Sequence, residues 1–154
     1  MAKANYNGFV KALLRNDVEE MNAYMNRVAL RTFSYFDIGS NPIEEPERFY
    51  HGLVISLLVQ LYQDYVVTSN RESGFGRYDV IIEPKIPYTG KDAFILEFKV
   101  HNPKKEKTLE ETVQSALMQI ETKKYETVLL EKGIPIERIY KYGFAFEGKN
   151  VLIG

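Results

Sequence analysis

The sequence has no cysteine and no tryptophan among its 154 residues. The absence of cysteine excludes a disulfide framework, a thiol nucleophile and a cysteine-based zinc site. No stretch approaches the roughly 18 consecutive apolar residues that a membrane span needs. The first residues, MAKANYNGF, contain no apolar run of the kind found in secretory signals. These absences favour a cytoplasmic protein that works without a membrane.

An excess of charge of either sign is also missing. The chain carries 20 Lys and Arg against 21 Asp and Glu, which gives a net charge of −1 at pH 7. This balance disfavours a protein that coats nucleic acid or an anionic membrane by bulk charge, so any basic surface has to be local. Hydrophobic residues make up 45% of the chain and charged residues 27%, which is ordinary for one globular domain.

The first part of the chain is predicted to be helical. Apolar residues at helical spacing predict helices within residues 5–37, and the GSNP sequence at 39–42 ends this region. Pro46 and its acidic neighbours mark the start of another helix. That helix is apolar on nearly all sides, as expected of a buried helix. We therefore divide the chain into an N-terminal helical extension, residues 1–40, and a main domain, residues 41–154, packed as one unit.

The second part is predicted to be rich in β-structure. The predicted strands are residues 65–69, 77–84, 93–100, 137–146 and 150–153. One long helix, residues 104–132, separates the third strand from the fourth, and Gly133 ends it. A hairpin pair followed by a crossover helix and another strand predicts a mixed sheet covered by helices, an α/β (α+β) fold.

Three charged residues interrupt strands that are otherwise apolar. Glu97 and Lys99 are two positions apart in AFILEFKV, so both side chains leave the same face of the strand. Asp79 interrupts the preceding strand in the same way. If the two strands pair, the three groups converge.

Two carboxylates a few ångström apart repel each other, and a divalent cation relieves that repulsion. Coordination by oxygen alone suits Mg²⁺ or Mn²⁺. Such an ion can polarise a phosphodiester and lower the pKa of a bound water. Lys99 would then orient this water or neutralise the developing charge. The alternative is a buried Glu–Lys pair that serves only the fold.

The acid–acid–lysine pattern resembles the D-x(n)-(D/E)-x-K signature of the PD-(D/E)XK nuclease superfamily. The predicted order helix–strand–strand–strand–helix–strand also resembles its restriction-endonuclease-like core. The stretches SNRESGFGRYDVIIEPK, ILEFKV and GFAFEGKNVLI resemble the nuclease-like domain found C-terminal to AAA-ATPase-like domains in uncharacterised prokaryotic proteins. Two departures exist: Tyr78 stands where the superfamily's name has Pro, and the sequence contains no G-x-x-x-x-G-K-[ST] motif.

The resemblance implies a metal site and a catalytic lysine. Asp79 and Glu97 would bind Mg²⁺ or Mn²⁺, and the backbone carbonyl of Phe98 would add a ligand. Lys99 would be the catalytic lysine. In exonuclease-type members a His on the first core helix is a further metal ligand, and His51 lies on the matching helix. The alternative for His51 is an inert, hydrogen-bonded helix residue.

The resemblance also implies supporting residues. Those members carry a Gln on the following core helix and a second polar residue one turn later; Gln119 fits, with Lys123 or Tyr125 as its partner. Gln119 and Lys123 share a helix face at the i, i+4 spacing. Glu72 and Arg77 flank the glycines of the loop before Asp79, where a phosphate backbone could approach closely. The alternatives are an ordinary exposed helix face and a plain strand connection.

The implied function is a metal-dependent nuclease that hydrolyses phosphodiester bonds in DNA. One alternative is a non-catalytic nucleic-acid-binding or regulatory module on a nuclease fold, normally attached to an ATPase. Another is a purely structural appendage of an ATPase. The expected partners are therefore nucleic acid, an ATPase domain in a longer relative, and a second copy of the chain if both strands of a duplex are cut.

Overall fold

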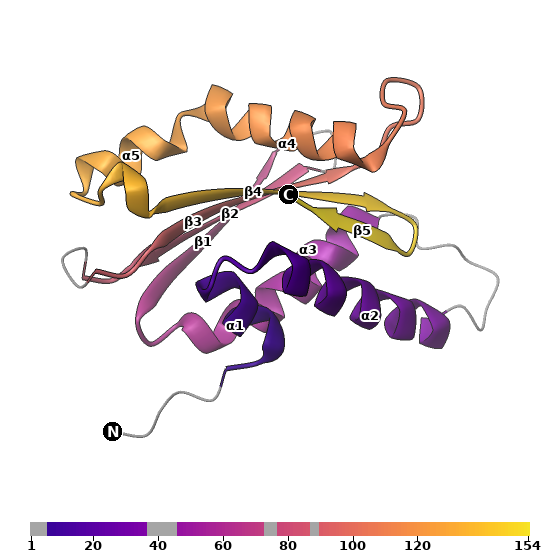
Figure 1. Ribbon diagram of the computed structural model, residues 1–154, viewed down its shortest axis with the longest axis horizontal. Coiled ribbons are helices and arrows are strands. Elements are labelled where there is room, and N and C mark those ends of the chain that lie inside the picture. Colours follow the sequence, from indigo (N-terminus) through magenta and orange to yellow (C-terminus); the bar gives the residue numbers. More distant parts are fainter. Residues whose placement is uncertain (1–5, 37–45, 73–76, 87–89) are drawn as a thin grey trace.

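The computed structural model describes residues 6–36, 46–72, 77–86 and 90–154, which form a five-stranded sheet with helices on both faces (Figure 1). The helices are α1 (Gly8–Leu14), α2 (Val18–Phe36), α3 (Pro46–Leu58), α4 (Leu109–Lys123) and α5 (Tyr125–Glu131), with short 3₁₀ turns η1 (Val59–Leu61) and η3 (Ile136–Arg138). The strands are β1 (Tyr65–Glu72), β2 (Arg77–Pro84), β3 (Ala93–Val100), β4 (Ile139–Glu147) and β5 (Asn150–Ile153).

The strands lie in the order β1-β2-β3-β4-β5. Three of the pairs are antiparallel, whereas β3 and β4 are parallel. A parallel pair needs a crossover connection, and α4 and α5 supply it. This arrangement confirms the predicted α/β (α+β) mixed sheet and agrees with a restriction-endonuclease-like core.

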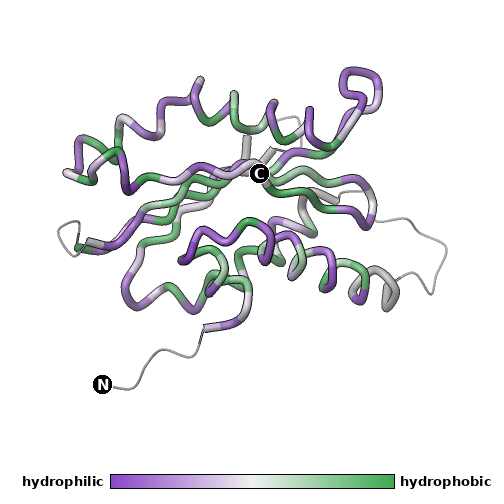
Figure 2. The backbone as a smooth tube through the Cα atoms, in the orientation of Figure 1, coloured by the Kyte–Doolittle hydropathy of each residue, from purple (hydrophilic) through white to green (hydrophobic). Residues whose placement is uncertain are grey.

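The two faces of the sheet differ in chemistry. On one face the aligned Tyr78 and Phe98 join the main hydrophobic core, which α1, α2 and α3 cover. The other face, under α4 and α5, carries the aligned Asp79 and Glu97 beside a smaller apolar cluster. In Figure 2 the strands carry many hydrophobic residues, and most outward turns of the helices are hydrophilic. No helix in the described part of the chain is long and apolar enough to cross a membrane.

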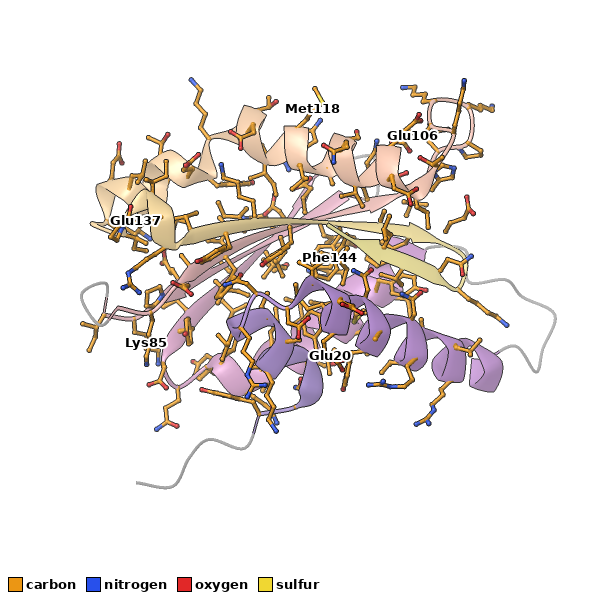
Figure 3. All side chains as sticks on the ribbon, viewed as in Figure 1. Glu20, Lys85, Glu106, Met118, Glu137 and Phe144 are labelled. Carbon is orange, nitrogen blue, oxygen red and sulfur yellow. The ribbon has the colours of Figure 1, made fainter. Side chains whose placement is uncertain are left out.

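The N-terminal helices belong to the main core. Phe9 and Met21 are fully buried in it, and the Phe9 ring makes an edge contact with Phe144. Figure 3 shows Phe144 between the sheet and this helical layer. Asn22 and Asn26 of α2 each donate to a β5 carbonyl and accept from the same residue's N–H, at distances of 2.8 to 3.0 Å. These two side chains therefore satisfy the edge of β5 as a neighbouring strand would.

The predicted single helix over residues 104–132 is wrong. It begins only at Leu109, where the Thr108 side chain accepts the N-cap hydrogen bond from the Glu111 N–H. It is also divided into α4 and α5 at Lys124, whose φ of 56° is left-handed. A left-handed residue cannot continue a right-handed helix, so the chain changes direction there. The predicted hairpin strand over 65–69 is longer than expected and reaches Glu72.

Candidate active site

Asp79 of β2 and Glu97 of β3 form the centre of the candidate site. They are direct partners in the antiparallel register, so both side chains leave the face covered by α4. Their side chains are 0% and 1% exposed. Two carboxylates buried side by side need compensating charge and hydrogen bonds, and the neighbouring elements provide both.

Three side chains hold Asp79. The Asn70 amide of β1 donates to Oδ1 at 3.0 Å, because Asn70 is the register partner of Asp79 on the other side. The Tyr125 hydroxyl donates to Oδ2 at 2.6 Å, and Lys123 Nζ lies 3.1 Å from the same oxygen. Burial raises the pKa of Tyr125 above its usual range, and the hydrogen bond to Asp79 and the charge of Asp79 raise it further. The phenol therefore keeps its proton and remains a donor.

Lys123 joins the two carboxylates. Its Nζ lies 3.1 Å from Asp79 Oδ2, 3.1 Å from Glu97 Oε1 and 3.3 Å from Glu97 Oε2. Three carboxylate oxygens thus converge on one cationic group at the last turn of α4. The Lys123 side chain is 13% exposed, so it closes the pair from solvent as well as balancing part of its charge.

Lys99 lies on the same face but in a second polar cluster. Its Nζ donates to Glu106 Oε2 at 2.7 Å and to Ser115 Oγ at 2.6 Å. Glu106 Oε1 accepts from the Asn102 N–H and from the Thr112 hydroxyl. Figure 3 shows Glu106 just before α4 begins. Lys99 is therefore paired with Glu106 and not with Glu97.

Two surface cavities flank the carboxylate pair along the strands. One of about 450 Å³ is lined by Lys99, Ser115 and Met118, among others. The other, of about 260 Å³, is lined by Tyr125 and Ile81. Lys99 comes after Glu97 on β3, and Ile81 comes after Asp79 on β2. Because the two strands run in opposite directions, Lys99 and Ile81 lie on opposite sides of the carboxylate pair, which is therefore between the two cavities.

His51 of α3 lies on the opposite face of the sheet. Its ring stacks on Tyr78 with centroids 4.1 Å apart, and its Nε2 is 2.5 Å from Ser69 Oγ. Burial lowers the pKa of His51, and the negative charge of Asp79 opposes that shift without reversing it. Tyr78 and Asp79 are neighbours on β2, so their side chains leave opposite faces of the sheet. Because His51 stacks on Tyr78, the structure does not bring it together with the Asp79–Glu97 pair.

The supporting residues expected from the sequence have different surroundings. Lys123 and Tyr125 contact the carboxylate pair directly, as described above. Gln119 is half-buried on α4, and its side chain makes no hydrogen bond within the described residues. Glu72 and Arg77 are register partners at the end of the β1–β2 pair, but their side chains and residues 73–76 lie outside the described part of the structure.

Sequence reasoning missed Asn70 and Glu106. For Asn70 the available signal was the hairpin, whose register places it opposite Asp79. For Glu106 the signal was an acidic residue within the lysine-rich stretch at 104–107, just before a capped helix. Neither signal identifies a partner without the three-dimensional register.

The donor set fits a hard divalent cation. Asp79 and Glu97 direct three oxygens to one position that a positive group already occupies, and oxygen ligands suit Mg²⁺ and Mn²⁺. Within the described residues no group of three or more His, Cys, Asp and Glu side chains could hold a metal ion. The remaining ligands would then be water, backbone carbonyl or substrate oxygens, because Mg²⁺ commonly keeps several waters and binds few protein carboxylates.

One comparison with known proteins found a match, to a family model. No curated protein and no solved structure matches the chain. The family model described as the PD-(D/E)XK nuclease superfamily matches residues 45–154, which include the whole sheet, α4 and α5. Members of this superfamily are usually nucleases that use divalent metal ions. By this match over most of its length, the chain belongs to the PD-(D/E)XK nuclease superfamily.

Proposed function

We propose that this protein hydrolyses phosphodiester bonds in DNA with Mg²⁺ or Mn²⁺ held by Asp79 and Glu97. The observation that carries the proposal is the convergence of both carboxylates, in register on adjacent strands, on a single cationic position. A fold has no need to bury two neighbouring carboxylates at 0% and 1% exposure, because apolar residues of similar size would stabilise it as well or better. A cation-binding role accounts for them.

The residues of the chain would divide the work. Asn70 and Tyr125 orient Asp79, so that its Oδ2 points to the shared position. Lys99 lies at the wall of the larger cavity, where its ammonium could stabilise charge on phosphate oxygens. A bound divalent cation would polarise the phosphodiester and lower the pKa of an attacking water.

A non-catalytic module is the second candidate. The observation in its favour is that Lys123 already pairs with both carboxylates and leaves them almost fully buried. In that case the superfamily fold would hold nucleic acid or regulate a partner without cutting. The formation of a homodimer is a further proposal, which light scattering of the purified chain would test. The attachment to an ATPase domain in longer relatives is another, which the sequence of such a relative would test.

Thermal unfolding with EDTA, Mg²⁺ or Mn²⁺ separates the candidates. A cation at about 100 times its Kd stabilises the folded state by about 2.7 kcal/mol. For a chain of this size that is a rise in Tm of about 5–10 °C. We expect this rise in the wild type and not in Glu97→Ala, which keeps the Asp79–Lys123 pair and so remains folded.

A nuclease assay on duplex and single-stranded DNA then completes the test. Glu97→Ala and Lys99→Ala should both abolish cutting while the circular dichroism spectrum is unchanged. A cation-induced rise in Tm without DNA cleavage on either substrate would favour the binding module. The absence of any rise in the wild type would remove the support for a metal-dependent nuclease.

A further inference from the structure

The amine of Lys123 occupies the position on which the two carboxylates converge. It lies 3.1 Å from an oxygen of each carboxylate, and all three side chains are at least 87% buried, with exposures of 13%, 0% and 1%. A metal ion bound by the same oxygens would lie about 2.0–2.1 Å from them. The two positive groups would then be within a few ångström of each other in a poorly solvated site, where like charges repel strongly.

We propose that Lys123 is a built-in counter-ion of the Asp79–Glu97 pair that competes with the divalent cation and thereby sets the cation affinity of the site. The proposal rests on the proposed function, because it concerns the same carboxylates. It assigns Lys123 a role different from that of Lys99, whose Nζ binds Glu106 and Ser115. Lys123 is a determinant of which cation binds, and how tightly.

The charge balance explains why exchange favours a divalent ion. Two ionised carboxylates carry −2, and the Lys123 ammonium leaves the buried group at −1. A divalent ion in the same place brings it to zero, whereas Na⁺ or K⁺ offers no more charge than the lysine already does. The resident ammonium therefore excludes monovalent cations and yields to divalent ones.

The local structure allows this exchange without moving Asp79. Asn70 and Tyr125 hold the Asp79 carboxylate from two sides, independently of the lysine. Lys123 itself ends α4, immediately before the left-handed Lys124 that starts α5. Its long, flexible stem lets the ammonium swing away while the helix stays in place.

The test is a titration of the EDTA-treated full chain with Mn²⁺, followed by calorimetry and by the electron paramagnetic resonance signal of free Mn²⁺. The variants are Lys123→Met, which removes the competing charge at similar volume, and Lys123→Arg, which retains it. Lys132→Met is the matched control, because Lys132 is exposed and pairs with Glu83, away from the carboxylate pair. None of these readouts depends on DNA cleavage.

We expect Lys123→Met to bind Mn²⁺ at least about tenfold more tightly than the wild type, a difference of about 1.4 kcal/mol. Lys123→Arg and Lys132→Met should not bind more tightly than the wild type. If the wild type shows no binding and Lys123→Met does, the competition is supported, whereas a metal-dependent activity of the wild type is not. Equal or weaker binding by Lys123→Met beside clear binding by the wild type would overturn the competition and leave the nuclease proposal standing.

If neither the wild type nor any variant binds Mn²⁺, the proposed function fails and the competition fails with it. Loss of a buried counter-ion can also prevent folding, so circular dichroism accompanies each titration. Should Lys123→Met not fold, Lys123→Gln replaces it, because its amide can still donate to one carboxylate. If Mn²⁺ but not Na⁺ restores the folded spectrum of Lys123→Met, the exchange is supported directly. If Mn²⁺ does not restore it and Lys123→Gln binds Mn²⁺ no more tightly than the wild type, the exchange is overturned.

Discussion

Replacing Glu106 by alanine should destabilise the protein by about 3 kcal/mol, at the lower end of the roughly 3–5 kcal/mol measured when one partner of a buried ion pair is removed. The Glu106 side chain is 7% exposed, and its partner Lys99 is 14% exposed. The substitution leaves the Lys99 ammonium with Ser115 as its remaining hydrogen-bond partner. It also removes the acceptor for the Asn102 N–H and the Thr112 hydroxyl. Some water can reach Lys99, which argues for the lower value.

Urea unfolding at pH 7 measures this loss, and thermal unfolding should show a fall in Tm of about 6–12 °C for a chain of this size. Glu110→Ala is the control, because Glu110 is exposed in the first turn of α4 and has no partner within the described residues. Its effect should stay within about 0.5 kcal/mol. A loss below about 1 kcal/mol for Glu106→Ala would refute the idea that this ion pair anchors the start of α4.

The same network predicts a pH dependence. Burial by itself would raise the pKa of Glu106, but hydrogen bonds from Lys99, the Asn102 N–H and Thr112 outweigh it and hold the pKa below its usual 4.5. The unfolded chain then binds the proton more readily than the folded one, so this stabilisation is present above pH 4.5 and is lost on acidification. The difference between wild type and Glu106→Ala should therefore shrink as the pH falls from about 5 to 3.

Two more predictions follow from close packing and from burial. Gly143→Ala should lower the free energy of unfolding in urea by about 1–3 kcal/mol, because an added Cβ would lie 2.7 Å from the Val113 backbone oxygen. A variant as stable as the wild type would show that α4 can move away freely. His51→Gln should flatten the pH dependence of stability between about pH 7 and 5. Burial lowers the pKa of His51 below 6.5, so the unfolded chain binds the proton more readily and the free energy of unfolding decreases as the pH falls. An unchanged slope of stability against pH in the variant would contradict this assignment.

The sequence predicts the strands, and the face of a strand on which a charged residue lies, because local patterns determine both. The alternation in AFILEFKV placed Glu97 and Lys99 on one face, and the structure has both under α4. The sequence places Asp79 beside Glu97 only on the condition that their strands pair, and the structure meets this condition. Period-two patterns and short connections carry this information directly.

Features that depend on contacts between residues far apart in the sequence could not be predicted in the same way. The sequence YETVLLE continues a helical pattern, and Lys124 has no glycine or proline signal for the left-handed turn that separates α4 from α5. Lys123 could be placed on a helix face by spacing, but its contact with both carboxylates depends on how α4 crosses β3. For His51 the helix was predicted well, whereas the face of the sheet that it contacts was set by tertiary packing.

The unequal apolar layers of the sheet have a consequence for access to the buried carboxylates. The core between the sheet and α1, α2 and α3 contains most of the large buried side chains, whereas α4 and α5 rest on a small cluster. That cluster consists of Ala93, Ile95, Ile120, Leu129, Ile134 and Ile139. Segments with few buried apolar contacts open locally at a lower free energy than the rest of a domain. Amide protons of α4 and α5 should accordingly exchange with solvent through partial openings that leave the opposite layer closed, and each such opening gives solutes in the surrounding water a route to the carboxylate pair.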